Sequence, residues 1–291
     1  MKKLILLVSL LSFSMHSQNV TVNSGRSFTI QSTSSLTVGG NFTNTAGTVT
    51  LNSSSDEFSS LLVSGASSGD ITYNRYVNIV GTGDWDLVGA PVSGMAFSEL
   101  IIDPNIATNG SGVYAVGAYD NSLDTWTNAT NATTGDLALG QGYQMATTNG
   151  GTLSFTGAIA NGDQSVIINN NNAANSGSGR RWNLIANPFA SYLHGNTNAD
   201  GTNNFLTVNT AAIDDNFEAI YGWKADGTGY EIYNNSSTTT YIAPGQGFFV
   251  AAAGSGADQT ISFTQAMQTV TGADDFISGR IMNPTSSEFL L

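Results

Sequence analysis

The chain has 291 residues, no cysteine and two histidines, and its formal net charge at pH 7 is −13. Such an acidic surface excludes nucleic acids and anionic membranes as expected partners, because both carry negative charge themselves. Without disulfides each domain must be stabilised by its buried core alone. Glycine, serine, threonine and asparagine are abundant, whereas the straight-chain helix formers lysine, glutamate and arginine are scarce. This composition favours strands joined by tight turns and predicts an all-β protein.

Residues 1–17 have the features of a secretory signal peptide. Lys2 and Lys3 form a short positive region, an apolar run follows, and Ser17 is a small residue suited to cleavage. The run is too short to cross a bilayer as a helix, which takes roughly 20 apolar residues. A buried N-terminal helix is the alternative interpretation. We expect a mature chain that begins at Gln18 and is secreted to the extracellular medium or the cell surface, with no membrane insertion after the signal is removed. Six basic residues then remain against 21 acidic ones.

Residues 18–68 contain short triplets that alternate with turn signals. They are Val20-Thr21-Val22, Phe28-Thr29-Ile30, Leu36-Thr37-Val38, Val49-Thr50-Leu51 and Leu61-Leu62-Val63. Short strands at regular spacing indicate a stack of β-strands. Each rung is too short to be stable alone and must pack on its neighbours. The pattern leaves two forms open, a β-solenoid and a β-meander.

Three motifs then occur twice in the same order, and only the loop lengths between them change. The first motif is Trp85-Asp86-Leu87, repeated as Trp182-Asn183-Leu184. The second is Gly140-Gln141-Gly142-Tyr143, repeated as Gly245-Gln246-Gly247-Phe248. The third is Leu153-Ser154-Phe155-Thr156, repeated as Ile261-Ser262-Phe263-Thr264. We predict two tandem β-sandwich-like repeats, at residues 69–160 and 181–271. An Asn/Gly/Ser-rich connector should join them at residues 161–180, and residues 272–291 should be a tail or the start of a further, truncated domain.

Strand alternation gives expectations for single residues inside the repeats. Arg75 lies among apolar residues on one face of a strand and should be a rim residue or be paired with an acid. Trp182 and Leu184 should point into the core together, as should Trp85 in the first repeat, whereas Asn183 should face solvent. The glycines of the Gly-Gln-Gly segments should allow a bulge or a close backbone approach. A phosphate loop is disfavoured because no helix former or lysine follows them.

Catalytic and metal-binding chemistry has few candidates. His16 belongs to the leader, so His194 is the one histidine available, and its polar loop is typical of a solvated residue rather than of a catalyst. Zinc would need several His or Cys ligands, and a glycosidase would need a distinct pair of carboxylates across a cleft. Calcium accepts loop oxygens, and Asp200-Gly201, Asp214-Asp215 and Asp226-Gly227 are candidates without the spacing of a known calcium loop. We predict no catalytic residue, no enzyme activity and no cofactor, with calcium as the one open possibility.

Each repeat also carries an aromatic hairpin, and these hairpins are the candidate ligand site. The first contains Tyr119 and Trp126 around a turn at Asp120-Asn121-Ser122, and the second contains Trp223 and Tyr230 around a turn at residues 226–229. Exposed Trp and Tyr rings can stack on sugar faces through their apolar bodies. The same rings could instead face inward as sandwich core.

Several stretches resemble secreted surface proteins of the Bacteroidetes, particularly flavobacteria. Besides the leader they are Asn74-Arg75-Tyr76-Val77, the two Trp-x-Leu motifs, Asn187-Pro188-Phe189 and Ala243-Pro244-Gly245-Gln246-Gly247-Phe248-Phe249. The resemblance covers nearly the whole chain and implies export by the type IX secretion system and an adhesin-like or repeat protein of unassigned function. Such proteins usually end in a C-terminal sorting domain, and none is recognised before Leu291. Either the sequence is a piece of a longer protein or export to the surface does not follow.

Three functions are therefore carried forward. The leading one is a non-enzymatic secreted or cell-surface protein of structural or adhesive type, with an extracellular glycan or a surface protein as its partner. The second is a carbohydrate-binding accessory module of a secreted polysaccharide-acting protein. The third is a secreted hydrolase.

Overall fold

The computed structural model describes residues 14–81, 85–171, 180–224, 228–254, 256–272 and 274–275, with side chains from residue 18 onward. Almost all regular structure in these residues is strand, so the predicted all-β class is confirmed. The described exceptions are α1 (Phe97–Leu100), α2 (Phe205–Asn209) and the 3-10 turn η1 (Gln265–Met267). In the described ranges no helix has the length and hydropathy needed to cross a membrane.

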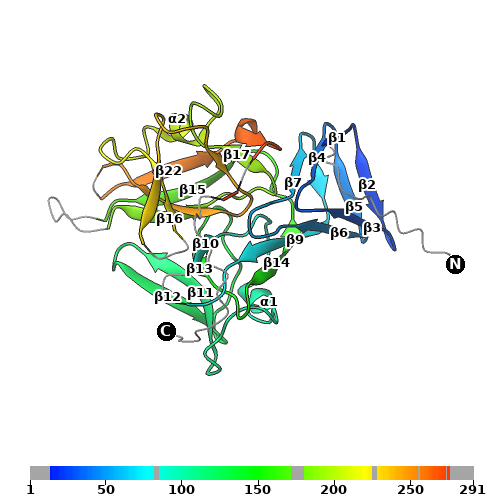
Figure 1. Cartoon of the computed structure of the whole chain (residues 1–291), viewed down its shortest axis with the longest axis horizontal. Helices are drawn as coiled ribbons and strands as arrows, with labels where there is room; N and C mark the ends of the chain where they lie inside the picture. Colours follow the sequence, from blue (N-terminus) through cyan, green and yellow to red (C-terminus); the bar gives the residue numbers. More distant parts are fainter. Residues whose placement is uncertain are drawn as a thin grey trace.

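The N-terminal strands wind into three coils of a parallel β-solenoid, on the right in Figure 1. One wall consists of β1 (Ser14–Ser17), β4 (Ser35–Val38) and β7 (Ser60–Val63), and the second of β2 (Val20–Asn23), β5 (Phe42–Thr45) and β8 (Ser67–Ser68). The third consists of β3 (Ser27–Ile30), β6 (Thr48–Asn52) and β9 (Asp70–Val77). Neighbours within each wall are parallel, whereas a meander pairs neighbours antiparallel. Of the two forms left open by the sequence, the solenoid is observed.

Alternation along the coils fills the solenoid with apolar side chains. Val38, Phe42 and Leu51 come from the three different walls and are each fully buried. Burying one such side chain contributes about 1.5–3 kcal/mol, which is what holds together rungs that are too short to be stable alone. Strand β1 lies inside the predicted leader, residues 1–17, and pairs with β4 in parallel. Residues 1–13 lie outside the described residues.

Strand β9 connects the solenoid to a two-layer unit. It pairs in parallel with β6 and antiparallel with β14 (Gly151–Ala158). A four-stranded antiparallel sheet, here called the first sheet, has the order β10 (Asp86–Val88), β13 (Tyr143–Met145), β11 (Val113–Asp120) and β12 (Thr125–Thr130). Val88, Val116 and Met145 of this sheet share one buried core with Leu153 and Phe155 of β14.

The second two-layer unit has the same strand order and lies above the first in Figure 1. Its strand pair is β15 (Gln164–Asn169) with β22 (Asp258–Phe263). The second sheet has the order β16 (Trp182–Ala186), β21 (Gly247–Ala251), β18 (Ile220–Trp223) and β19 (Tyr230–Tyr233). Ile185, Phe248 and Val250 pack with Ile261 and Phe263 in its core. A small sheet of β20 (Tyr241–Ile242), β17 (Tyr192–His194) and β23 (Gln268–Thr269) adjoins it.

The Gly-Gln-Gly segments cross from each unit to the sheet of the other. Gln246 forms an antiparallel bridge to Val88 in the first sheet, and Gln141 forms one to Ile185 in the second. A Cβ atom on Gly247 would lie 2.6 Å from the backbone of the first sheet, a distance that real side chains do not reach. The close backbone approach predicted for these glycines is confirmed, and it fixes the two sheets side by side.

The structure corrects the predicted connector at residues 161–180. Residues 164–169 of it form β15, in which Ile168 is fully buried in the second core and Val166 packs against it. Val166 and Ile168 lie two residues apart, the spacing that puts two side chains on one face of a strand. The prediction missed this strand because it weighted the run of asparagines that follows it. Residues 172–179 lie outside the described residues.

Arg75 is paired with an acid, as predicted, but it is buried rather than at a rim. Its Nη2 donates to Asp275 Oδ2 at 2.7 Å and its Nε donates to the carbonyl of Pro244 at 2.9 Å. The guanidinium lies 4.1 Å from the ring centroid of Phe58, and both charged side chains are fully buried. Asp275 belongs to the predicted tail, 272–291, so this part of the tail is fixed against β9. Residues 276–291 lie outside the described residues.

Candidate functional site

Both faces of the second sheet are apolar: one covers the core of its unit, and the other packs in part on Leu87 of the first sheet. Because side chains alternate along a strand, Ile185 and Phe248 point into the core and their neighbours Leu184 and Phe249 point to the opposite, outer face. The outer face is also the location of four more aromatic side chains: Trp182, Tyr221, Trp223 and Tyr230. An aromatic surface of this kind is unusual on the outside of a sheet, where polar residues are expected.

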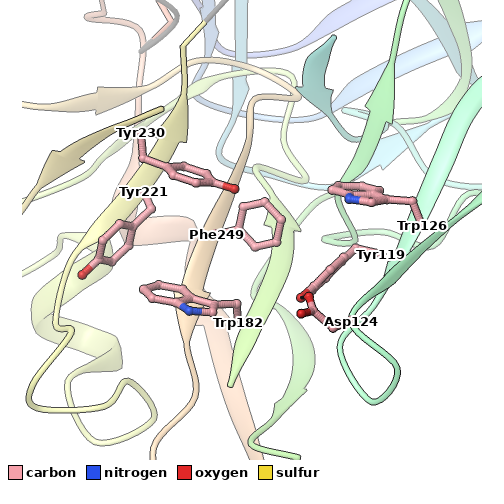
Figure 2. A pocket seen from close by; sticks show the side chains of 7 residues that line it. All are labelled: Tyr119, Asp124, Trp126, Trp182, Tyr221, Tyr230 and Phe249. Atoms are coloured by element: carbon pink, nitrogen blue, oxygen red, sulfur yellow. Dashed lines mark hydrogen bonds between the residues drawn. The ribbon is translucent and has the colours of Figure 1, made fainter. Parts of the chain in front are cut away.

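The hairpin of β11 and β12 approaches this outer face from the first sheet (Figure 2). Tyr119 and Trp126 pair across the hairpin, with their ring centroids 5.1 Å apart. Tyr119 meets Phe249 edge-to-face at 5.3 Å, and Tyr230 meets Phe249 at 5.8 Å from the other side. Edge-to-face pairs of this separation are each favourable by about 0.5–1.5 kcal/mol beyond area burial. Rings of both sheets are therefore held in fixed positions around Phe249.

A cleft of about 250 Å³ opens between these rings, and we call it the aromatic cleft. Trp182, Tyr221 and Tyr230 of the second sheet line it on one side, and Tyr119, Asp124 and Trp126 of the hairpin line it on the other, with Phe249 between them. Phe249 is buried, but Trp126 and Tyr230 remain 38% and 45% exposed. The cleft thus combines a buried floor with accessible rings at its rim.

Asp124 supplies the carboxylate of the cleft. It lies in the hairpin turn with a positive φ of 55°, and its Oδ1 accepts a hydrogen bond from the Tyr119 hydroxyl at 2.7 Å. Burial raises the pKa of the Tyr119 hydroxyl, and the hydrogen bond to Asp124 raises it further. Burial also raises the pKa of Tyr230, with a smaller contribution from the charge of Asp124. Both hydroxyls are therefore neutral at pH 7. The O–H of Tyr119 is already donated to Asp124, so the Tyr230 hydroxyl is the donor that can face a ligand.

The structure brings together three of the four residues predicted for the ligand site. Tyr119, Trp126 and Tyr230 line the cleft, whereas Trp223 packs behind Tyr230 with ring centroids 5.0 Å apart. Local sequence patterns could not place the two hairpins at one site, because they do not specify how the two units pack against each other. Tyr221 was missed, although it lies two residues before Trp223 and so on the same face of its strand.

The predicted orientation of Trp182 is wrong. Trp182 and Leu184 share a face, as expected, but that face is the wall of the cleft, and the core lies on the side of Asn183. Trp182 is half-buried, with its ring 4.5 Å from that of Tyr221. Trp85 is also half-buried, against a cluster of alanines in the first sheet. The error arose because the sheet is apolar on both faces, so alternation alone could not tell which face is inside.

Asn183 is likewise not the solvated residue that was predicted. Its Oδ1 accepts from the backbone N–H of Asn169 at 3.1 Å, and its Nδ2 donates to the carbonyl of Asn169 at 2.9 Å. Asp86, at the same motif position in the first sheet, is buried and accepts from the backbone N–H of Asn78 at 2.8 Å. In both sheets, therefore, the middle residue of the Trp-x-Leu motif accepts a hydrogen bond from a backbone N–H at the end of the preceding strand. This N–H belongs to Asn78, one residue after β9, in the first unit and to Asn169, the last residue of β15, in the second.

The other predicted polar sites lie apart from the cleft. His194 Nδ1 is 4.0 Å from Asp200 Oδ2, and burial lowers the pKa of the imidazole. Asp200 accepts from two backbone N–H groups of its own turn, and Asp214 is paired with Arg181 at 2.7 Å. Asp226-Gly227 lies outside the described residues. Within the part of the chain that the structure describes, no group of three His, Cys, Asp or Glu side chains is placed to hold a metal ion.

Comparison with known proteins assigns the chain to a family. A family model described as a domain of unknown function (DUF8693) matches residues 7–287. The chain belongs to this family. The match spans the solenoid, both two-layer units and the residues of the aromatic cleft. Neither the curated proteins nor the solved structures gave a match.

Proposed function

We propose that this chain is a non-enzymatic extracellular protein of adhesive type and that it binds carbohydrate through the aromatic cleft. The observation that carries the proposal is the exposure of Trp126 and Tyr230, at 38% and 45%, on the outer faces of two sheets that each cover a core on the opposite side. Folding alone does not require these rings at the surface. Exposed apolar surface rimmed by polar groups is characteristic of interaction sites.

The chemistry of the cleft suits a sugar. A pyranose ring has C–H faces that pack on aromatic rings, and its edge carries hydroxyls that both donate and accept hydrogen bonds. The rings of Trp126 and Tyr230 offer such packing surfaces. The carboxylate of Asp124 is a strong acceptor, and the neutral hydroxyl of Tyr230 is a donor.

The proposal that the protein is not an enzyme rests on the separation of its reactive groups. His194 lies in the small sheet with β20 and β23, and it does not line the aromatic cleft. Among the residues that the structure describes, Asp124 is the carboxylate that lines the cleft, whereas glycoside hydrolysis takes two carboxylates across the scissile bond. We propose that His194→Ala changes neither ligand binding nor any turnover of the bound glycan.

The cellular location that we propose rests on features of the sequence. The leader-like residues 1–17 and the resemblance to Bacteroidetes surface proteins support secretion, and a type IX route to the cell surface is the setting we propose. An acidic, disulfide-free chain with a glycan-binding cleft fits attachment to an extracellular polysaccharide.

We further propose that the two units are tandem copies of one unit. The strand order β10-β13-β11-β12 matches β16-β21-β18-β19, and the duplicated motifs have the same register. Leu87 pairs with Gln144 and Leu184 pairs with Phe249, each at the residue after the Gly-Gln-Gly-aromatic motif. The cleft then arises from two equivalent aromatic hairpins, of which the first contributes Tyr119 and Trp126 and the second contributes Tyr221 and Tyr230.

A glycan array probed with the purified chain tests the proposed function. We expect binding to at least one plant, algal or microbial polysaccharide, and loss of that binding in Trp126→Ala. Ile102→Ala is the matched control, because Ile102 is 77% exposed and lies outside the cleft. If Trp126→Ala binds as the unmodified chain does, or if no glycan on the array is bound, the proposal is refuted.

A further inference from the structure

A second hollow lies next to the aromatic cleft and has the opposite chemistry. Its volume is about 270 Å³, and most of its lining is polar. Asn121, Gln141, Asn169 and Asn183 supply side-chain amides, and Asp120 supplies a carboxylate. We call this the amide pocket.

The two hollows meet at Tyr119. The ring of Tyr119 lines both of them, with Asp124 and Trp126 on the cleft side and Asp120 and Asn121 on the other. On the opposite wall the same strand, β16, contributes Trp182 to the cleft and Leu184, which lies on the same face, to the amide pocket. A chain molecule that passes Tyr119 along this face would therefore reach the amide pocket.

The amides of the pocket are held in place before any ligand arrives. Asn121 Nδ2 donates to Asn169 Oδ1 at 2.9 Å and to Asn183 Oδ1 at 3.2 Å. Asn171 Nδ2 donates to Asn121 Oδ1 at 2.8 Å. Such a network fixes the direction of each amide dipole, so little conformational entropy is lost when hydroxyl groups bind to it.

No lysine or arginine lines either hollow among the residues that the structure describes. The two carboxylates, Asp120 and Asp124, are the charges present, and hydrogen bonds within its turn lower the pKa of Asp120. A ligand with carboxylate or sulfate groups would therefore meet repulsion without a compensating cation. A neutral hydroxyl-rich ligand instead meets the carboxylate and amide oxygens of the two hollows as acceptors for its hydroxyl groups.

We propose that the aromatic cleft and the amide pocket form one groove that binds a neutral oligosaccharide of several units. This inference rests on the proposed function and specifies its ligand class. One sugar ring packs among the rings of the cleft, and the following units pass Tyr119 and bind through their hydroxyls to the amide pocket.

Isothermal titration with oligosaccharides of defined length tests this inference. The probes are neutral cello-, xylo- and manno-oligosaccharides of two, four and six units, with oligogalacturonates of the same lengths as the acidic counterpart. We expect at least one neutral series to bind, with an affinity that rises about tenfold or more from two to six units, since each tenfold step needs only about 1.4 kcal/mol. The oligogalacturonates should not bind.

Two variants separate the two halves of the groove. Ile167 lines the amide pocket and is 57% exposed, so Ile167→Arg fills the pocket without disturbing a core. It should reduce the affinity for six units to that for two units and leave the shorter ligand unaffected. Trp126→Ala should weaken both, and Ile102→Arg, the same change at a distant exposed site, should weaken neither.

The outcomes distinguish the inference from the function on which it rests. If Trp126→Ala abolishes binding but affinity is independent of length and of Ile167→Arg, the aromatic cleft is the site and the extended groove is refuted. If the acidic series binds better than the neutral ones, the ligand class is wrong. If Trp126→Ala has no effect on any bound ligand, the proposed function itself fails.

Discussion

At the scale of single residues, the middle position of the Trp-x-Leu motif has a clear structural role. Asn183 Oδ1 accepts a hydrogen bond from the backbone N–H of Asn169, so removing the amide takes this acceptor away from that N–H. The Asn169 carbonyl, to which Asn183 Nδ2 also donates, keeps its hydrogen bond from Asn121 Nδ2. We expect Asn183→Ala to cost about 1–3 kcal/mol of unfolding free energy. Urea unfolding measures this. A cost below about 0.5 kcal/mol, the usual range for a surface substitution, would contradict the role of Asn183.

Trp182→Ala should act on binding as much as on stability. The ring is half-buried and packs edge-to-face on Tyr221 and Phe217, so part of its surface is already in contact with water. We expect a loss below the roughly 3–5 kcal/mol of a fully buried aromatic, together with weaker glycan binding because the cleft loses one wall. Thermal melting and titration of the same sample check both. Complete unfolding at ambient temperature would mean that Trp182 is a core residue after all.

The buried pair of Arg75 and Asp275 joins positions 200 residues apart in the chain. Removing one partner leaves a buried charge uncompensated, which typically costs about 3–5 kcal/mol. We therefore expect Asp275→Ala to lower the urea midpoint strongly, and Arg26→Ala, at an exposed arginine in the solenoid, to leave it unchanged. Equal midpoints for Asp275→Ala and the unmodified chain would show that the pair does not stabilise the fold.

The burial of His194 should make the stability of the fold depend on pH. Burial lowers the pKa of His194 from its ordinary value of 6.5, although the charge of Asp200 opposes this. The unfolded chain therefore binds more protons than the native one as the pH falls below about 6.5, so this contribution destabilises the fold on acidification and vanishes above that pH. His194→Gln should make the urea midpoint less dependent on pH between about 5.5 and 7. An unchanged slope in the variant would contradict it.

At the scale of elements, the positions of the strands could be predicted from the sequence better than the pairing between them. The triplets from Val20 to Val63 became solenoid strands because alternation and turn residues are local signals. The parallel pairing that makes them a solenoid depends on contacts between residues far apart, which the triplets do not encode. In the same way, Val166 and Ile168 formed β15 inside a predicted connector because β22 was available as a partner.

The candidate site was predicted only in part for a related reason. Tyr119, Trp126 and Tyr230 could be named from hairpin patterns, but Asp124 and Phe249 could not. Phe249 follows Phe248 on one strand, so the two rings point to opposite faces of the sheet. Which of them is in the core depends on the face against which the pair β15–β22 packs. The cleft exists only because two elements from different units meet, and no local pattern specifies that contact.

At the scale of the whole molecule, the two units should superpose. An experimental structure should place residues 70–160 on residues 165–270 with β10 on β16, β13 on β21 and β11 on β18. Asp86 should then coincide with Asn183, and Tyr119 with Trp223. A superposition in which these strands match in order but the motif residues are shifted by one position would contradict a tandem duplication, because a shift of one reverses every face.

The central claim is that rings from both sheets form one carbohydrate site. The most direct measurement is calorimetric titration of the best array ligand into the unmodified chain, Trp126→Ala, Tyr230→Ala and the control Ile102→Ala. Trp126 comes from the first sheet and Tyr230 from the second, so each change alone should lower affinity by about tenfold or more, while the control binds normally. All four should be folded at the temperature of the titration, with Trp126→Ala and Tyr230→Ala melting somewhat lower because each loses ring contacts with Phe249. Full affinity in either Trp126→Ala or Tyr230→Ala would contradict it.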